Sequence, residues 1–489
     1  MSKIRHNAYE NLTVKHDAFP YQREAVESIR DKAYAAIFHE QGLGKTKIAI
    51  DILLYWIDKL DTDCVMIITK KQLVSNWEDE FTSHTHLKTK VLSNQRKDNF
   101  YAFNSNARII ITNFETISFE KERIKLFLET RNVGVIIDES TKIKNPTSKL
   151  TQDFFEIRSL FKKRIIMTGT PIANRPYDIW AQIYFLDSGN SLGTNFEEFK
   201  SSTDLSNDLY LNKTKQQAFE ESVASIFSKI KDFTVRETKD SGIISLPNKV
   251  YHDIYTEFER TQKEMYDHVR NEMQIMVQKG DKVILDESPE SIKRLLRLVQ
   301  ITSNPLLLDN LYGQVSSKEK ELDKIISLII QRGEKVIVWS IFTDNIDYFT
   351  RKYSSHKAVK ITGKMNIDDR KASVKKFKDS DSKILFATPQ AAKEGLTLTV
   401  ANNVIFYDRG FSLDDYLQAQ DRIHRISQTK ECNIYNLMVE NSIDVWIDKL
   451  LQSKQNAAFL AQGDKSLSQY QIDSDYSYGE MIKDILKTE

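Results

Sequence analysis

Short apolar runs rich in β-branched residues recur through the first third of the chain, and polar or helical segments separate them. Each run has the length of a buried strand and ends in polar or charged residues. The runs are CVMIIT at 64–69, ARIIIT at 107–112, VGVIIDES at 133–140 and KRIIMTGT at 163–170. Alternation of this kind indicates βαβ units and predicts an α/β fold with a doubly wound parallel sheet.

The alternation then gives way to polar segments of helical character at about 186–235 and 257–300. Strand-like runs return afterwards, which predicts a second α/β lobe. These runs are EKVIVWS at 334–340, HKAVKIT at 356–362, SKILFAT at 382–388, ANNVIFYD at 401–408 and ECNIYNLMV at 431–439. We therefore expect an N-terminal lobe over 1–248, a C-terminal lobe over 249–462 and a polar C-terminal tail over 463–489.

Composition and charge place few limits on the function. The chain has 489 residues, of which 28% are charged, and its formal net charge is +1. A nearly neutral total neither requires nor excludes a nucleic-acid partner, because acidic faces elsewhere can balance a basic groove. No apolar run reaches the roughly 20 residues of a membrane span, and the polar N-terminal stretch is not a secretory signal. We expect a soluble, cytoplasmic protein with no membrane partner.

The chain has two cysteines, Cys64 and Cys432, which lie far apart in the sequence. Their spacing fits neither a disulfide framework nor a metal site. We expect two buried thiols.

The stretch FHEQGLGKTKIAIDILL at 38–54 has the features of a phosphate-binding loop followed by a helix. Gly42 and Gly44 let the backbone approach a phosphate closely, and amides at the start of the following helix point at the anion. Lys45 can neutralise the β- and γ-phosphates of a nucleotide, and Thr46 can hold Mg²⁺. The match to GxxxxGK[ST] lacks the first glycine, and an ordinary loop before a helix is the alternative.

Two further motifs follow predicted strands in the same lobe. VGVIIDES ends in Asp138 and Glu139, and an aspartate at a strand end downstream of a phosphate-binding loop can hold Mg²⁺. The neighbouring glutamate can polarise the attacking water, whereas the alternative for the pair is a solvated acidic turn. IIMTGTPIAN places small hydroxyl residues and a glycine at another strand end. They either link the acidic site to a bound nucleic-acid strand or to the other lobe, or simply form a turn. These residues are Thr168, Gly169 and Thr170.

The second lobe contains YLQAQDRIHRISQT at 416–429, which we expect to be a helix. On such a helix Gln418, Arg422 and Arg425 lie at i, i+4 and i+7 and share one face. Arginines there can stabilise the charge on a transferred phosphoryl group. A solvated basic helix face is the alternative.

Together, these motifs resemble the Swi/Snf-type ATPases, helicase-like DNA translocases of superfamily two. The resemblance extends from about residue 18 to residue 455, in the family's order. The matching stretches are FPYQREAV, EQGLGKT, IITKKQLVSNWEDEF, IIITNFETI, DESTKIKN, MTGTP, FTVRETKDSGIISLP, LVQITSNPLLL, EGLTLTVANNVIFYD and QAQDRIHRISQT. DEAD-box RNA helicases would show D-E-A-D and S-A-T, and both are absent.

Three positions differ from the pattern that these ATPases usually show. His39 stands where an acidic residue usually precedes Glu40, and Asn304 stands where a histidine usually precedes proline. Thr141 occupies the position of a usual histidine in the D-E-x-H motif. This last change concerns the coupling of hydrolysis to DNA rather than hydrolysis itself.

The resemblance implies two RecA-like doubly wound parallel-sheet lobes with helical insertions, and ATP and Mg²⁺ as cofactors. The residues implied in catalysis are Lys45, Asp138, Glu139, Arg422 and Arg425. Those implied in nucleotide binding are Gln22, near the adenine, and Gly42, Gly44, Lys45, Thr46 and Gln418. Those implied in metal binding are Thr46 and Asp138.

The resemblance also implies double-stranded DNA as the partner, bound with weak sequence selectivity through its phosphates. Candidate backbone contacts are Lys70, Thr112, Asn113, Gly363, Thr397 and Thr399, although residues after strands are often only turn formers. A DNA-dependent ATPase and translocase is the function implied. The alternatives are a strand-separating helicase on DNA or RNA and an ATPase-poor scaffold protein, and the intact catalytic residues argue against the scaffold.

Overall fold

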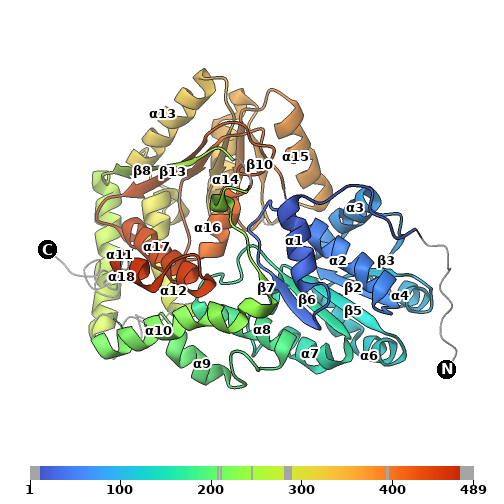
Figure 1. Ribbon diagram of the computed structural model, residues 1–489. Helices are drawn as coiled ribbons and strands as arrows, with labels where there is room; N and C mark the ends of the chain where they lie inside the picture. The colour runs from blue at the N-terminus through green and yellow to red at the C-terminus, as the bar shows by residue number, and fades with distance from the viewer. Residues whose placement is uncertain are drawn as a thin grey trace. The chain divides into compact units, whose positions relative to one another are not determined.

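The computed structural model describes residues 11–205, 209, 212–243, 246–279, 289–391 and 396–473. The chain forms two compact units (Figure 1). Unit 1 holds the described residues of Met1–Asp204, Ala218–Ile244 and Ala458–Leu467, and unit 2 holds those of Leu205–Gln217, Ser245–Ala457 and Ser468–Glu489. Most of the predicted tail, residues 474–489, lies outside the described residues.

Unit 1 is built on a parallel sheet of seven strands in the order β3-β4-β2-β5-β6-β1-β7. The strands are β1 Tyr34–Ile37, β2 Cys64–Thr69, β3 Thr89–Val91, β4 Ile109–Asn113, β5 Val133–Asp138, β6 Lys163–Met167 and β7 Thr234–Val235. The four predicted strands are confirmed as β2, β4, β5 and β6. The other three have only two to four residues, too few to stand out as apolar runs.

Helices cover both faces of this sheet (Figure 1). The helices of this part of the chain are α1 Pro20–Ile29, α2 Lys45–Lys59, α3 Val74–His84, α4 Arg96–Phe103, α5 Phe114–Phe119, α6 Lys121–Thr130, α7 Lys149–Ile157, α8 Trp180–Asp187, α9 Phe196–Thr203 and α10 Lys213–Ile230, of which α10 belongs to unit 1 only from Ala218 onward. Successive β2 residues, such as Ile67 and Ile68, are fully buried because each points to a different covered face. Burial on both faces explains why the strands read as continuous apolar runs.

Unit 2 is built on a parallel sheet of six strands in the order β10-β11-β9-β12-β13-β8. The strands are β8 Lys249–Thr256, β9 Val336–Trp339, β10 Val359–Ile361, β11 Ile384–Ala387, β12 Asn403–Phe406 and β13 Cys432–Val439. All five predicted strands are confirmed. The strand β8 was not predicted because it lies at the sheet edge, where apolar and polar residues alternate and no continuous apolar run forms.

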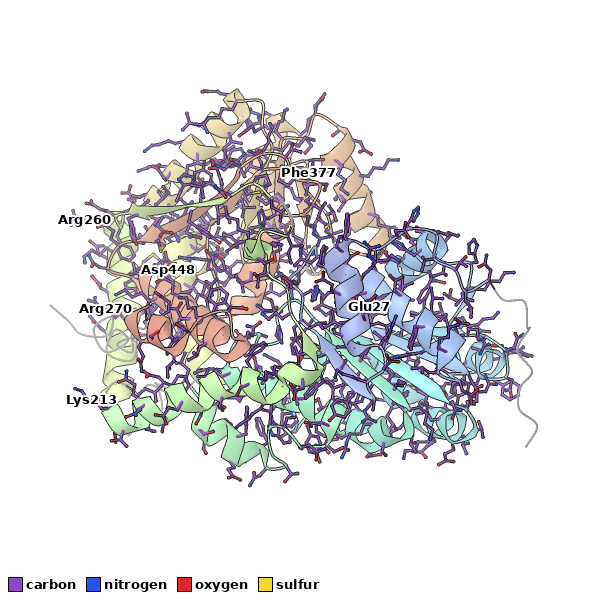
Figure 2. All side chains as sticks on the ribbon, in the orientation of Figure 1. Glu27, Lys213, Arg260, Arg270, Phe377 and Asp448 are labelled. Atoms are coloured by element: carbon purple, nitrogen blue, oxygen red, sulfur yellow. The ribbon has the colours of Figure 1, made fainter. Side chains whose placement is uncertain are left out.

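The helices of unit 2 pack on both faces of its sheet. The helices of the remaining chain are α11 Arg260–Lys279, α12 Pro289–Ser303, α13 Ser317–Gln331, α14 Thr343–Lys352, α15 Ile367–Asp379, α16 Leu413–Gln420, α17 Ile443–Gln462 and α18 Leu467–Asp473; the end of α17 from Ala458 onward and the first residue of α18 belong to unit 1. Along β9, Val338 joins the core under α13 and α14, whereas Trp339 joins the core of the other face. Phe377 of α15, labelled in Figure 2, belongs to that second core.

The fold confirms the predicted class, since both units are α/β with parallel sheets. The helices α9 and α10 fall within the predicted segment 186–235, and α11 and α12 fall largely within 257–300. Cys64 and Cys432 are both buried free thiols, as expected. Within the described ranges, no helix is long and apolar enough to cross a bilayer.

One prediction about secondary structure is wrong. A helix over 416–429 was expected, but α16 spans only Leu413–Gln420 and turns follow it. The carbonyl of Arg422 accepts a 2.9 Å hydrogen bond from the backbone N–H of Leu398, so a tertiary contact takes a group that a longer helix would use internally. The residues that therefore do not share a helix face are Gln418, Arg422 and Arg425.

Candidate nucleotide-binding site

The loop between β1 and α2 in unit 1 has the backbone shape of a phosphate cradle. Gly42 and Gly44 adopt left-handed conformations with φ of 90° and 71°. A Cβ atom at Gly44 would lie 2.2 Å from Nε2 of Gln22, so a side chain there is excluded by conformation and by space. The helix α2 begins directly at Lys45, so the loop leads straight into the helix N-terminus, where the helix dipole favours an anion.

Gln22 of α1 braces this loop. Its Oε1 accepts a 3.0 Å hydrogen bond from the backbone N–H of Phe19. Its Nε2 donates to the carbonyl of Leu43 at 3.4 Å and lies 3.3 Å from the hydroxyl of Tyr21. The predicted adenine contact is therefore also a support for the glycine turn of the loop.

The ammonium group of Lys45 lies on the loop's own backbone. Its Nζ donates to the carbonyls of His39 at 3.0 Å and Glu40 at 3.2 Å. Gly169 lies against the same group, because a Cβ at that position would be 3.3 Å from Nζ of Lys45 and 2.8 Å from Cγ of Gln41. The sequence marked the TGT stretch only as a turn or a link, but the structure shows that glycine permits its close approach to the loop.

Asp138 lies at the end of β5, and β2 is its neighbouring strand. Ile68 pairs with Ile137, so the last residues of the two strands, Thr69 and Asp138, lie side by side. Oδ2 of Asp138 accepts hydrogen bonds from the hydroxyl of Thr69 at 3.1 Å and from the indole N–H of Trp77 at 2.9 Å. Trp77 lies in the stretch IITKKQLVSNWEDEF that carries the family resemblance, whereas Thr69 was not among the predicted site residues.

Burial raises the pKa of the Asp138 carboxyl, and the neighbouring Glu139 raises it further. Three groups oppose this rise in pKa because they favour the ionised form: the indole of Trp77, the ammonium of Lys45 and the hydroxyl of Thr69. Because the strands of this sheet are parallel, the loop after β1 and the end of β5 lie at the same edge, where the positive charge of Lys45 acts on the Asp138 carboxyl.

Glu139 has a strained backbone and an ion-paired side chain. Its φ of 56° is unusual for a residue other than glycine, a conformation that tends to persist at functional sites. Its Oε2 lies 3.2 Å from Nζ of Lys70, and both side chains are largely buried. Lys70 was predicted to contact nucleic acid, and the structure pairs it with the predicted water-activating carboxylate.

His39 is a buried imidazole beside this site. Neither ring nitrogen makes a hydrogen bond of ordinary geometry to any residue that the structure describes. Burial and the positive charges of Lys45 and Arg236 lower the pKa of His39 to about 4, and the nearby Val235 carbonyl offsets them only partly. The ring is therefore neutral at physiological pH, so it does not supply the negative charge that an acidic residue would carry here.

In unit 2 the structure brings several predicted residues together. Arg422 is buried, and its Nε donates to the carbonyl of Gln418 at 3.1 Å. Nη1 of Arg425 donates to the hydroxyl of Thr397 at 2.7 Å. The hydroxyl of Thr399 lies 2.8 Å from that of Ser427. Arg425, a predicted catalytic residue, and Thr397, a predicted nucleic-acid contact, are therefore hydrogen-bonded partners in unit 2.

The other predicted nucleic-acid contacts differ in their exposure. Thr112 is fully buried, and within the described chain its hydroxyl has no hydrogen-bond partner. The side chain of Asn113 caps α5 by accepting from the backbone N–H of Thr116 at 3.0 Å. Gly363 faces open space. The roles of these three residues remain predictions.

The donor set in unit 1 fits a small hard cation with a nucleotide. The hydroxyl of Thr46 and the carboxylate of Asp138 are oxygen ligands of the kind that Mg²⁺ prefers, and phosphate oxygens and water usually complete its coordination. The lysine and the helix start would meet the remaining charge of a triphosphate.

Two family models match the chain. The SNF2-related domain matches residues 21–307, and the helicase conserved C-terminal domain matches residues 317–427. An "uncharacterized ATP-dependent helicase" of Mycoplasma pneumoniae is 29% identical over 453 residues, which cover 89% of this chain and 41% of that protein. The chain therefore spans less than half the length of that relative.

Two further comparisons concern DNA-associated proteins. The ATP-dependent DNA helicase DDM1 of Arabidopsis thaliana is 26% identical over 449 residues, which cover 85% of this chain and 57% of that protein. The solved SWI2/SNF2 ATPase core of Sulfolobus solfataricus in complex with double-stranded DNA is 23% identical, with a TM-score of 0.43, and the match covers 95% of this chain and 98% of that chain.

Proposed function

The chain belongs to the SNF2-related family, and from this membership we propose that it hydrolyses ATP and uses the energy to move along double-stranded DNA. The observation that carries the proposal is the placement of the loop after β1 and the end of β5 at the same edge of the parallel sheet in unit 1, where the charge of Lys45 acts on the Asp138 carboxyl. The matched family model and the printed names of the relatives support ATP as the fuel.

Each residue of the cradle has a distinct task in this proposal. Lys45 exchanges the carbonyls of His39 and Glu40 for phosphate oxygens, because a charged acceptor binds an ammonium more strongly than a neutral carbonyl does. Thr46 and Asp138 hold Mg²⁺, which would neutralise charge on the β- and γ-phosphates. The hydrogen bonds that Trp77 and Thr69 donate fix the orientation of the Asp138 carboxylate and favour its ionised form.

Glu139 orients the water that attacks the terminal phosphorus and accepts its proton. Arg422 and Arg425 supply positive charge to the transferred phosphoryl group. The hydrogen bonds to Gln418 and Thr397 restrict both guanidinium groups to defined positions, and a pre-oriented cation loses less entropy when it acts.

The DNA partner is proposed from the family and from the name of the Arabidopsis relative. Binding would be through phosphates, so we expect weak sequence selectivity and a strong dependence on salt. Lys70 has the charge that such a contact requires. A strand-separating helicase is the second candidate, because the printed names of both relatives contain that word.

The test compares ATP hydrolysis by the full chain with duplex DNA, single-stranded DNA, RNA and no nucleic acid. We expect the largest stimulation with duplex DNA, and Lys45→Ala should abolish turnover while the circular dichroism spectrum is kept. Lys59→Ala is the matched control, because Lys59 ends the same helix and is exposed. Equal rates under all four conditions would refute the DNA-dependent motor.

A second pair of assays separates translocation from strand separation. A translocase displaces the third strand of a triplex but leaves a flanking duplex intact, whereas a helicase releases one strand of a forked duplex. We expect activity in the triplex assay alone. Activity in the fork assay would favour the second candidate.

A further inference from the structure

The ion pair between Lys70 and Glu139 joins a predicted nucleic-acid contact to the proposed water-activating carboxylate. Lys70 directly follows β2 and Glu139 directly follows β5, two strands that are neighbours in the sheet. Their Nζ and Oε2 atoms lie 3.2 Å apart, and the side chains are 23% and 15% exposed. The pair is therefore shielded from bulk water and screened less by salt than a surface pair would be.

We propose that Lys70 is a positioning residue that holds Glu139 away from its task until a nucleic-acid phosphate draws the lysine off; this inference rests on the proposed function. The ammonium of Lys70 occupies Oε2, one of the two oxygens with which Glu139 could orient water. An intact ion pair thus lowers the rate of hydrolysis.

The backbone of Glu139 limits the ways in which the restraint can be relieved. Because its φ is 56°, the residue has a narrow choice of backbone conformations, and Lys142 N–H donates to its carbonyl at 3.0 Å. The carboxylate is therefore more easily released by movement of the partner than by movement of Glu139 itself. Lys70 is the partner with a long flexible side chain, and it keeps partial access to solvent.

Phosphate is the chemical class of ligand that can compete for Lys70. A phosphodiester carries a full negative charge and several acceptor oxygens, as a carboxylate does, and DNA presents many of them in a row. Transfer of Lys70 from Glu139 to a phosphate keeps the lysine paired and frees the carboxylate. Stimulation of hydrolysis by DNA then follows without any direct contact between DNA and nucleotide.

The test measures ATP turnover of the full chain with and without saturating duplex DNA. We expect Lys70→Met to raise the DNA-free rate several-fold and to reduce the ratio of stimulated to basal rate by a similar factor. Lys70→Arg keeps the charge and should retain more of the ratio of stimulated to basal rate than Lys70→Met does. Lys71→Met is the matched control, because it removes the same charge at the next, exposed position and should leave the ratio unchanged.

The result that would overturn the inference is a DNA-free rate in Lys70→Met that equals or falls below that of the wild type. A wild type that hydrolyses ATP without any response to DNA would instead refute the proposed function. Even in that case, a raised basal rate in Lys70→Met would identify the ion pair with Glu139 as a restraint on hydrolysis. A double-mutant cycle with Glu139→Gln on the midpoint of thermal unfolding tests the ion pair without any activity measurement. Additive shifts in that cycle would show that the two side chains do not interact in solution.

Discussion

The carboxylate of Glu40 accepts a 2.9 Å hydrogen bond from the backbone N–H of Lys239. Glu40 also donates its own backbone N–H to the carbonyl of Glu237 at 2.9 Å, and the carbonyl of Glu40 accepts from Nζ of Lys45 at 3.2 Å. Glu40 therefore connects Lys45 to residues 237–239, which shortly precede the passage of the chain from unit 1 to unit 2. These hydrogen bonds of Glu40 hold the start of the loop between β1 and α2 in place.

Glu40→Ala should lower the free energy of unfolding of unit 1 by about 1–2 kcal/mol, because it leaves the Lys239 amide without this charged acceptor. It should also raise the KM for ATP, since the loop loses an anchor next to Lys45. Glu40→Gln keeps an acceptor oxygen and should lose less of both. Urea denaturation and steady-state kinetics measure the two effects, and equal behaviour of the two variants would argue against the hydrogen bond as the cause.

Trp77→Phe should move the acidic limb of the pH–rate profile to higher pH. The substitution keeps an aromatic ring but removes the indole N–H that donates to Asp138. Because that hydrogen bond favours the ionised carboxylate, its loss raises the pKa of Asp138 further, and a larger fraction is protonated at a given pH. Protonated Asp138 is a poorer ligand for Mg²⁺.

The control for this prediction is Trp180→Phe. Trp180 also donates an indole hydrogen bond in unit 1, to the carbonyl of Gly193 at 3.1 Å, but it has no part in the candidate site. It should lower stability without moving the pH–rate profile. An equal displacement of the profile in both variants would refute the role given to Trp77.

His39 should make the protein less stable as the pH falls from about 6.5 towards about 4. In the unfolded chain the ring takes up a proton near pH 6.5, whereas the folded protein keeps it neutral until about pH 4. The unfolded state therefore binds more protons in this window, and the difference corresponds to about 3 kcal/mol at its lower end. Above about pH 6.5 the ring is neutral in both the folded and the unfolded state, so this loss of stability is absent.

His39→Asn removes the titrating ring and should flatten the dependence of the unfolding midpoint on pH in this window. Thermal unfolding of both proteins between pH 4 and pH 7.5 measures the difference. His268→Asn is the control, because His268 is exposed on α11 and its loss should leave the dependence unchanged. Parallel curves for wild type and His39→Asn would contradict the lowered pKa.

Arg425→Ala should lower kcat by about 10²–10³-fold and leave the affinity for ATP nearly unchanged, because its proposed charge acts on the transferred phosphoryl group and not on the bound ground state. Lys430→Ala removes a nearby, largely exposed cation and should keep the wild-type kcat. Single-turnover hydrolysis and nucleotide binding separate the two quantities. A loss of ATP affinity equal to the loss of rate would assign Arg425 to binding.

The sequence alone determined every inner strand of the two sheets except the short β1, together with the edge strand β10 and the motifs that follow these strands. A strand buried on both faces reads as a continuous apolar run, which is a local property and needs no knowledge of its neighbours. The runs before Thr69 and Asp138 are of this kind. The edge strand β8 was not predicted, because exposed and partly buried residues alternate along it and it has no continuous apolar run.

The tertiary structure alone decided which of the motif residues meet. Lys70 and Glu139 are 69 residues apart, and they become partners only because β2 lies next to β5 in the sheet. The end of α16 was likewise decided outside the local sequence, because the Arg422 carbonyl bonds to Leu398 instead of continuing the helix. Hydrophobic periodicity encodes how a segment is buried, whereas strand order and long-range hydrogen bonds arise from the packing of distant segments.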